Sequence, residues 1–119
     1  MRSGTENVPG IVGLAVACEK MIGKNYENAE KIREVKEYFQ ERIKEIEDIK
    51  DNSGKAPHVA SISFKKLRSE VLLHALEDRE IYVSSGSACS SNKKQAVSGT
   101  LNAIALSDEF KDGTLRFSF

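Results

Sequence analysis

A single cysteine, Cys89, stands in a run of small and hydroxyl-bearing residues, Ser84-Ser85-Gly86-Ser87-Ala88-Cys89-Ser90-Ser91. The run follows a short β-like stretch, Ile81–Val83. No bulky side chain anchors such a segment, glycine loosens its backbone, and hydroxyl groups can solvate a thiolate. The pattern therefore favours a nucleophilic thiol on a loop that moves. From these residues alone, a cysteine that merely follows a strand is an equal alternative.

The other residues that could be catalytic or bind a ligand stand in less informative patterns. Cys18 lies among apolar and small residues, where a thiol packs as a small hydrophobic group. His58 and His74 lack the spacing of metal ligands, so we expect no zinc site. The segment Ser85-Gly86-Ser87 lacks the spacing and the following lysine of a phosphate-binding loop.

The residues around Cys89 need a scaffold, and the clearest element is a long helix. Its apolar residues recur every three or four positions from Asn25 or Asn28 onward, as on one face of a helix. The stripe comprises Ala29, Ile32, Val35, Phe39, Ile43, Ile46 and Ile49. We expect the helix to end at 51–54, where Gly54 and then Pro57 are stop signals. A shorter helix, Ile11–Met21, is rich in small apolar residues and is expected to be largely buried.

Strands and short helices complete the pattern. Alternation predicts a half-buried strand over Val59–Phe64 and a last strand over 115–119, with Arg116 opposite the inward Leu115 and Phe117. Ser69 is expected to cap a following helix. Ile81–Val83 is expected to form a strand and 95–106 a helix. This order predicts an α+β fold, a two-layer sandwich with a small, partly antiparallel sheet.

The charge composition of the chain indicates which partners it is not expected to bind. The chain has 119 residues, with 18 Lys and Arg against 18 Asp and Glu. Zero formal charge argues against nucleic acid or an anionic membrane as a main partner. No apolar run reaches the roughly 20 residues that span a bilayer, and the start does not resemble a secretory signal. Because the chain has two cysteines, we do not expect a disulfide framework. We expect a reducing, cytoplasmic location.

Three stretches together resemble the C-terminal part of NifS/IscS-type cysteine desulfurases, in the class V aminotransferase family. Residues 2–13, Arg2-Ser3-Gly4-Thr5 to Gly13, are similar to the segment that precedes the family's C-terminal domain. Residues 84–91 are similar to its active-cysteine loop, and Leu115-Arg116-Phe117-Ser118 to its substrate-binding strand. The resemblance extends over nearly the whole chain and implies the small domain of a fold-type I pyridoxal-phosphate enzyme.

The resemblance assigns roles to three residues. Cys89 would be the nucleophile that takes sulfur from L-cysteine, leaving L-alanine and an enzyme persulfide. Arg116 would bind the substrate carboxylate, and Thr5 would bind the cofactor phosphate of the neighbouring subunit in the family homodimer. A sulfur-acceptor protein would then receive the persulfide sulfur for iron–sulfur cluster or other cofactor assembly.

Other family features have no counterpart in this sequence. The lysine, aspartate and histidine that hold pyridoxal phosphate belong to the family's large domain, and no segment here resembles the lysine motif. The final helix is missing, and Ala105 stands where relatives commonly have glycine. We therefore expect a fragment that is inactive and binds no cofactor alone. Its expected parts are an inter-domain segment and helix, 1–24, and a truncated small domain, 25–119.

Two other functions fit the same residues. Cys89 could serve a stand-alone persulfide carrier or interaction module that needs no cofactor. The chain could also derive from a selenocysteine lyase or another class V relative, because the sequence does not distinguish sulfur from selenium.

Overall fold

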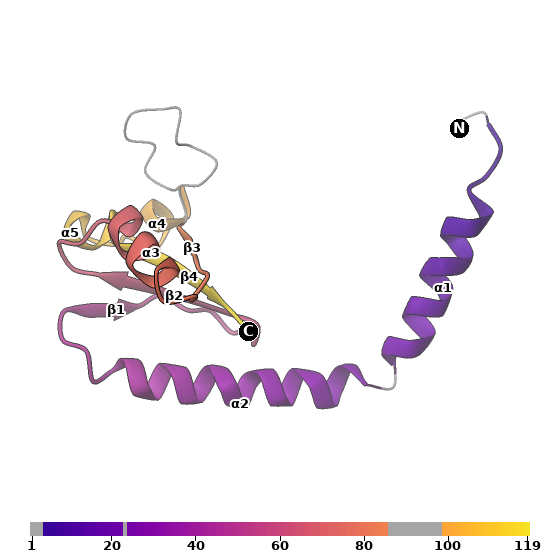
Figure 1. The fold of residues 1–119 in the computed structure, drawn as a ribbon, viewed down its shortest axis with the longest axis horizontal. Helices are drawn as coiled ribbons and strands as arrows, with labels where there is room; N and C mark the ends of the chain where they lie inside the picture. Colours follow the sequence, from indigo (N-terminus) through magenta and orange to yellow (C-terminus); the bar gives the residue numbers. More distant parts are fainter. Residues whose placement is uncertain (1–3, 23, 86–98) are drawn as a thin grey trace.

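A computed structural model describes residues 4–22, 24–85 and 99–119. The described helices and strands follow the order α1 (Val8–Ile22), α2 (Asn25–Ile43), β1 (Ile49–Asp51), β2 (Val59–Phe64), α3 (Ser69–Glu77), β3 (Ser84–Ser85), α4 (Gly99–Ala103), α5 (Asp108–Lys111) and β4 (Thr114–Ser118). The strands form one sheet in the order β1-β2-β4-β3, with α2 running along it and α1 extending away (Figure 1). The expected α+β fold is confirmed.

All pairings among the described strands are antiparallel. Ile49 of β1 pairs with Phe64 of β2, and Ser61 of β2 pairs with Arg116 of β4. On the other edge of β4, Ser84 of β3 also pairs with Arg116. Because partners in register share one face of a sheet, Ser61, Arg116 and Ser84 lie on the same face.

The opposite face of the sheet carries the core. Ala60, Ile62 and Leu115 are fully buried there. Helix α2 covers this face, since the Phe39 ring lies 4.7 Å from the Phe117 ring, centroid to centroid. Tilted aromatic pairs at such distances add to the energy of apolar burial. Apolar packing of α2 therefore stabilises this face of the sheet.

The core-facing side of α2 differs from the predicted stripe. Val35 is 53% exposed, whereas Lys36 is 5% exposed. The Lys36 ammonium donates hydrogen bonds to the carbonyl oxygens of Gly54 and Ala56, both at 2.8 Å. A buried charge needs such partners, and a long apolar stem lets lysine occupy a core-facing position.

The predicted end of α2 is also wrong. The helix ends at Ile43, and Ile49 begins β1 instead of continuing the stripe. Asp48 adopts a left-handed backbone conformation with φ of 57°, which no continuous right-handed helix accommodates. The spacing of Ile49 matches the apolar stripe of α2, but its apolar side chain suits a strand such as β1 equally well.

Two further local predictions differ from the structure. Ile81–Val83 is not a strand; within the described residues 81–85, Ser84 and Ser85 are the ones that pair with β4. Ser69 does not cap α3 through its side chain: it is the first helical residue, buried, and its N–H donates to the carbonyl oxygen of Asp112.

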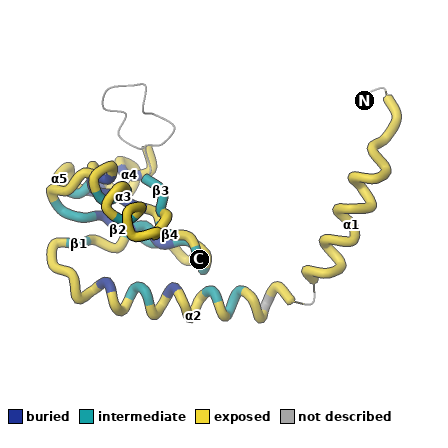
Figure 2. The backbone as a smooth tube through the Cα atoms, viewed as in Figure 1, coloured by how far each residue is buried: buried dark blue, intermediate teal, exposed yellow. Residues whose placement is uncertain are grey.

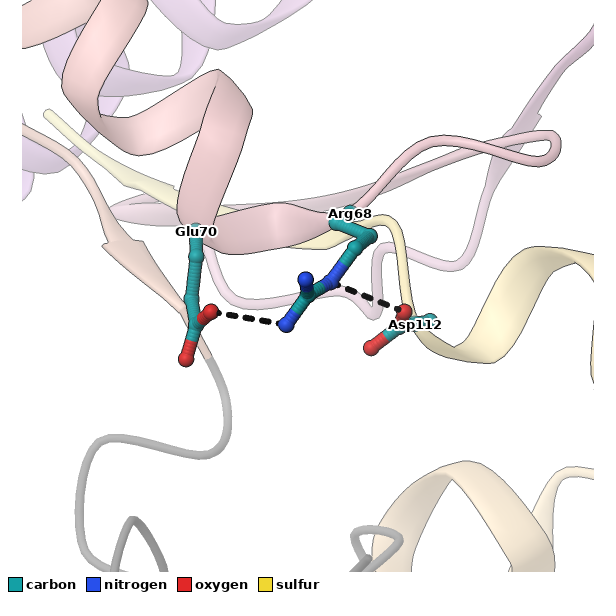
Figure 3. Close-up of polar contacts among 3 residues, drawn as sticks. All are labelled: Arg68, Glu70 and Asp112. Carbon is teal, nitrogen blue, oxygen red and sulfur yellow. Dashed lines mark hydrogen bonds and ion pairs between the residues drawn. The ribbon is translucent and has the colours of Figure 1, made fainter.

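Surface groups reinforce this junction between α3 and the turn before β4. Arg68 donates to Glu70 at 3.0 Å and approaches Asp112 at 3.8 Å (Figure 3). These side chains are largely exposed, so the pairs contribute little energy. The backbone is also closely packed at this junction, because a Cβ on Gly113 would overlap the carbonyl oxygen of Phe64.

The helix predicted over 95–106 falls partly outside the described residues. Its described portion, α4, ends at Ala103, and Ala105 then takes a left-handed conformation with φ of 52°. The N–H of Ala105 donates to Asn102, and the N–H of Leu106 donates to Leu101. This is the Schellman arrangement that usually has glycine at its left-handed position.

Helix α1 contradicts the expected burial. It begins at Val8, earlier than predicted, after Asn7, whose side chain accepts a hydrogen bond from the Gly10 N–H at 3.2 Å. Every residue described in it is exposed (Figure 2). The radius of gyration is 18.8 Å, against about 13.5 Å for a compact chain of this length. Burial was misjudged because no described element packs on α1.

None of the described helices combines the length and apolarity needed to cross a membrane.

Candidate active site

The pairing of β3 with β4 brings two predicted site segments together. Ser84 and Ser85, the first residues of the serine-rich run, pair with Arg116 and Leu115. Cys89 itself lies outside the described residues, four positions beyond Ser85. Arg116, the predicted substrate-binding residue, and the first residues of the serine-rich run are thus adjacent in the fold, although Ser84 and Arg116 are 32 positions apart in the sequence.

Alternation along β4 explains how Arg116 is presented. Its neighbour Leu115 is fully buried on the α2 side, so the Arg116 side chain must lie on the opposite face, where it is exposed. The guanidinium donates to the Ser84 hydroxyl at 3.4 Å. No carboxylate of the described ranges lies within ion-pair distance of it. Its paired N–H donors can therefore receive an external carboxylate.

Hydroxyl groups extend along the same face of the sheet. Asn52 donates to the Ser63 hydroxyl, which shares a hydrogen bond of 2.7 Å with the Thr114 hydroxyl. Thr114 in turn donates to the carbonyl oxygen of Phe110 at 3.2 Å. These hydrogen bonds link β2 and β4 with Asn52, which follows β1, and with Phe110 of α5, and they satisfy the buried hydroxyls. They fix the beginning of β4 two residues before Arg116.

Ser84 is the site residue that sequence analysis did not single out. Composition places Ser84 only in the serine-rich run, because the expected strand covers Ile81–Val83. Tyr82 is 78% exposed, so the apolar character of that stretch does not reflect burial in the sheet. The signal that could have found Ser84 is pairing register, which follows from tertiary contact rather than composition.

Thr5 is not brought to Arg116 within this chain. It is exposed, it precedes α1, and the N-terminal end lies far from the sheet (Figure 1). Cys18 was predicted to pack as a structural thiol, but it is exposed on α1. His74 lies 3.3 Å from Glu77 on the same helix. Among the described residues no three His, Cys, Asp or Glu side chains group as metal ligands would.

Pyridoxal phosphate requires a site that accepts its phosphate group. A hollow of about 390 Å³ between α2 and β1 is lined by Glu37, Gln40, Glu41, Lys44 and Asp51. Three of these are carboxylates, which repel a phosphate group. The Asp51 carboxyl is already engaged: burial raises its pKa, but hydrogen bonds from Ser53 and Gln40 hold it below the usual range. This hollow does not fit the cofactor.

Comparisons with known proteins agree on one family. A family model described as aminotransferase class V matches residues 1–119. A protein named cysteine desulfurase IscS from Dictyoglomus turgidum is 36% identical over 98% of this chain. The NifS/IcsS protein homolog of Lactobacillus delbrueckii subsp. bulgaricus is 33% identical over the whole chain. This chain covers 30% of the first relative's length and 32% of the second's.

Solved structures give the same result. The NifS-like protein of Rickettsia africae superposes with a TM-score of 0.78 at 25% identity, covering 99% of this chain and 31% of that one. A second NifS-like protein matches with the same TM-score at 26% identity.

Proposed function

This chain belongs to the class V aminotransferase family, and we propose that it is the sulfur-accepting portion of a pyridoxal-phosphate-dependent cysteine desulfurase. The observation that carries the proposal is the pairing of Ser84 with Arg116. It puts the predicted carboxylate-binding residue beside the strand from which the Cys89 segment continues. Four residues of chain from Ser85 to Cys89 span at most about 14 Å. The thiol is therefore tethered within reach of a substrate held by Arg116.

In this proposal Arg116 binds the α-carboxylate of L-cysteine. Its guanidinium is exposed and has no carboxylate partner in the described part of the chain, so binding substrate requires no ion pair to break. The Ser84 hydroxyl accepts a hydrogen bond from the Arg116 guanidinium, and this bond restricts the orientation of the guanidinium. A guanidinium so held can donate two parallel hydrogen bonds to the carboxylate.

Cys89 is the proposed sulfur acceptor. Its thiolate bonds to the substrate sulfur while the substrate's carbon–sulfur bond breaks, and the carbon is protonated to give L-alanine. The products are alanine and a persulfide on Cys89. Tethering replaces a bimolecular encounter with an intramolecular one, which lowers the entropic part of the barrier. The persulfide sulfur then passes to an acceptor protein, a reaction that suits the cytoplasm.

The cofactor belongs to the complementary part of the enzyme in this proposal. Pyridoxal phosphate supplies the electron sink for breaking the carbon–sulfur bond. The chain covers about 30% of its relatives, and the hollow at Glu37, Glu41 and Asp51 is unsuited to phosphate. We therefore expect no turnover by this chain alone. Thr5 would meet the cofactor phosphate only in a homodimer of the complete assembly.

The test joins this chain to the complementary part of the Dictyoglomus turgidum relative and measures alanine formed from cysteine. Cys89→Ser should abolish turnover, whereas Cys18→Ser, the matched thiol control, should not change it. Arg116→Lys should raise KM for cysteine at least about tenfold, because an ammonium cannot make the paired contact. Full turnover by Cys89→Ser, or alanine formed by the unjoined chain, would refute the proposal.

Experiments on the same proteins distinguish a stand-alone persulfide carrier from a portion of a desulfurase. The unjoined chain is incubated with a persulfide donor and examined by mass spectrometry. Stable added sulfur on Cys89 that transfers to an acceptor, together with an inactive joined protein, would support the carrier instead. Replacing cysteine by selenocysteine in the turnover assay tests the selenocysteine alternative.

A further inference from the structure

Arg116 lies between two hydroxyl-bearing residues on one face of the sheet. Ser61 of β2 and Ser84 of β3 are both in register with Arg116, one on each side of β4. All three side chains lie opposite the face on which Ala60 and Leu115 are fully buried. Ser61 is half-buried and not covered, so a small ligand held by Arg116 has access to its hydroxyl.

The strand pairing brings Ser61 close to Arg116. Hydrogen-bonded and non-hydrogen-bonded pairs alternate along two antiparallel strands. The Phe119 N–H donates to the His58 carbonyl oxygen, so the register places Ser61 in a non-hydrogen-bonded pair with Arg116. The side chains of such a pair are the closer ones, with Cα atoms about 4.5 Å apart instead of about 5.5 Å.

The hydroxyls of Ser61 and Ser84 differ in what they bond. The Ser84 hydroxyl accepts from the Arg116 guanidinium at 3.4 Å, which draws the guanidinium towards β3. The Ser61 N–H donates to the Ser53 hydroxyl at 3.0 Å, so the backbone of Ser61 is fixed. The Ser61 hydroxyl itself bonds to no side chain or backbone group within residues 4–22, 24–85 and 99–119. It is therefore available to donate to a ligand.

The space between the Arg116 guanidinium and Ser61 suits a carboxylate. Neighbouring strands are about 4.8 Å apart, so Ser61 and Ser84 are about 10 Å apart across β4. The guanidinium lies on the Ser84 side of that span. A carboxylate that accepts hydrogen bonds of about 2.8 Å on both of its sides spans more than about 5.6 Å. One carboxylate can therefore meet the guanidinium and the Ser61 hydroxyl together.

We propose that Ser61 is a further substrate-binding residue, which donates a third hydrogen bond to the α-carboxylate held by Arg116. The paired N–H groups of Arg116 use one lone pair on each carboxylate oxygen, and the remaining lone pairs can accept from a hydroxyl. Ser61 then selects for an anionic ligand, because hydrogen bonds to a charged acceptor are the stronger ones. The inference rests on the proposed function, since it adds a contact to the same substrate.

The experiment follows the side-chain N–H resonance of Arg116 by NMR in the isotope-labelled 119-residue chain. The probe is L-alanine, which carries the α-carboxylate without sulfur. Its addition should shift the resonance, whereas L-alaninamide, which has no carboxylate, should not. Ser61→Ala should weaken L-alanine binding at least about threefold, and Ser61→Thr, which keeps a hydroxyl, should restore it. Ser107→Ala is the matched control, because Ser107 is an exposed serine outside the sheet.

Turnover by this chain joined to the complementary part of the Dictyoglomus turgidum relative gives an independent measurement. Ser61→Ala should raise KM for cysteine at least about threefold and leave kcat unchanged, because the carboxylate contact is made equally before and during reaction. Ser107→Ala should change neither constant.

The inference is overturned if L-alanine does not shift the Arg116 resonance, or if L-alaninamide shifts it equally. It is also overturned if Ser61→Ala binds L-alanine as tightly as the unaltered chain does. Ser61-dependent binding of L-alanine, together with a joined protein that makes no alanine from cysteine, would support the carboxylate contact while refuting the proposed function. Turnover with a KM that Ser61→Ala leaves unchanged would support the proposed function and refute the contact.

Discussion

Replacing Ala105 by glycine should stabilise the chain, although glycine usually weakens a fold. Ala105 has φ of 52°, and the N–H groups of Ala105 and Leu106 close the end of α4 onto Asn102 and Leu101. The geometry is fixed by burial on both sides, since Leu101 and Leu106 are 8% and 2% exposed. The backbone therefore cannot relax to a conformation that alanine prefers.

Two opposing effects set the magnitude. A left-handed conformation costs an L-residue roughly 1–2 kcal/mol, and glycine removes this cost. Glycine also adds unfolded-state entropy worth about 0.4–1 kcal/mol. The expected gain in the free energy of unfolding is therefore about 0.5–1 kcal/mol. With a urea slope of about 2 kcal/mol/M, the unfolding midpoint should rise by about 0.3–0.5 M.

Urea titration of Ala105→Gly, followed by circular dichroism, measures this shift in the isolated chain. Ala103→Gly is the control because it makes the same chemical change at the last residue of α4. There glycine relieves no left-handed strain and should lower stability by up to about 1 kcal/mol. If both substitutions lower the midpoint, the left-handed conformation at Ala105 is not costing the fold energy and the reasoning is wrong.

Three further substitutions test other contacts. Gly113→Ala should destabilise the chain by more than about 2 kcal/mol in thermal unfolding, because its Cβ would overlap a backbone carbonyl; a change within about 0.5 kcal/mol would contradict this. Lys36→Met should cost about 1–3 kcal/mol by leaving two carbonyls without their donor, whereas exposed Lys31→Met should change urea stability little. The pKa of Asp51 is lowered, against the effect of burial, chiefly by hydrogen bonds from Ser53. The carboxylate therefore stabilises the fold above its unfolded pKa near 4 and this contribution disappears as pH falls through the lower folded value. The stability difference between Asp51→Asn and the unaltered chain should shrink between pH 6 and pH 2, and a constant difference would refute this assignment.

Sequence patterns predicted elements well where one local periodicity had one structural solution. The alternation of Val59–Phe64 became β2 with the same bounds, and the fold class and the resemblance to NifS/IscS-type proteins were confirmed. Ile49 shows the limit of the method, because its spacing suits the α2 stripe and its apolar character suits β1. Only pairing with Phe64 decides between them.

Burial was harder to predict than secondary structure because it depends on distant partners. Val35 and Lys36 are neighbours on one helix, and hydrophobicity alone assigns the core to Val35. The carbonyls of Gly54 and Ala56 reverse that choice by giving the Lys36 ammonium two acceptors. The helix α1 was predicted correctly, but its predicted burial is wrong because no described element packs on it.

The sheet order suits the two chemical roles proposed for Arg116 and Cys89. Strand β4 is interior, bonded on both sides by β2 and β3, so Arg116 has a backbone held from two directions. Strand β3 is a short edge strand, and the Cys89 segment continues from it. A carboxylate anchor gains from rigidity because misplacement weakens catalysis. A sulfur acceptor must meet first a substrate and then a second protein, which an interior strand would prevent. Exchanging the two positions would impair both steps, so the antiparallel pair β3–β4 is the part of this fold that the proposed sulfur transfer most requires.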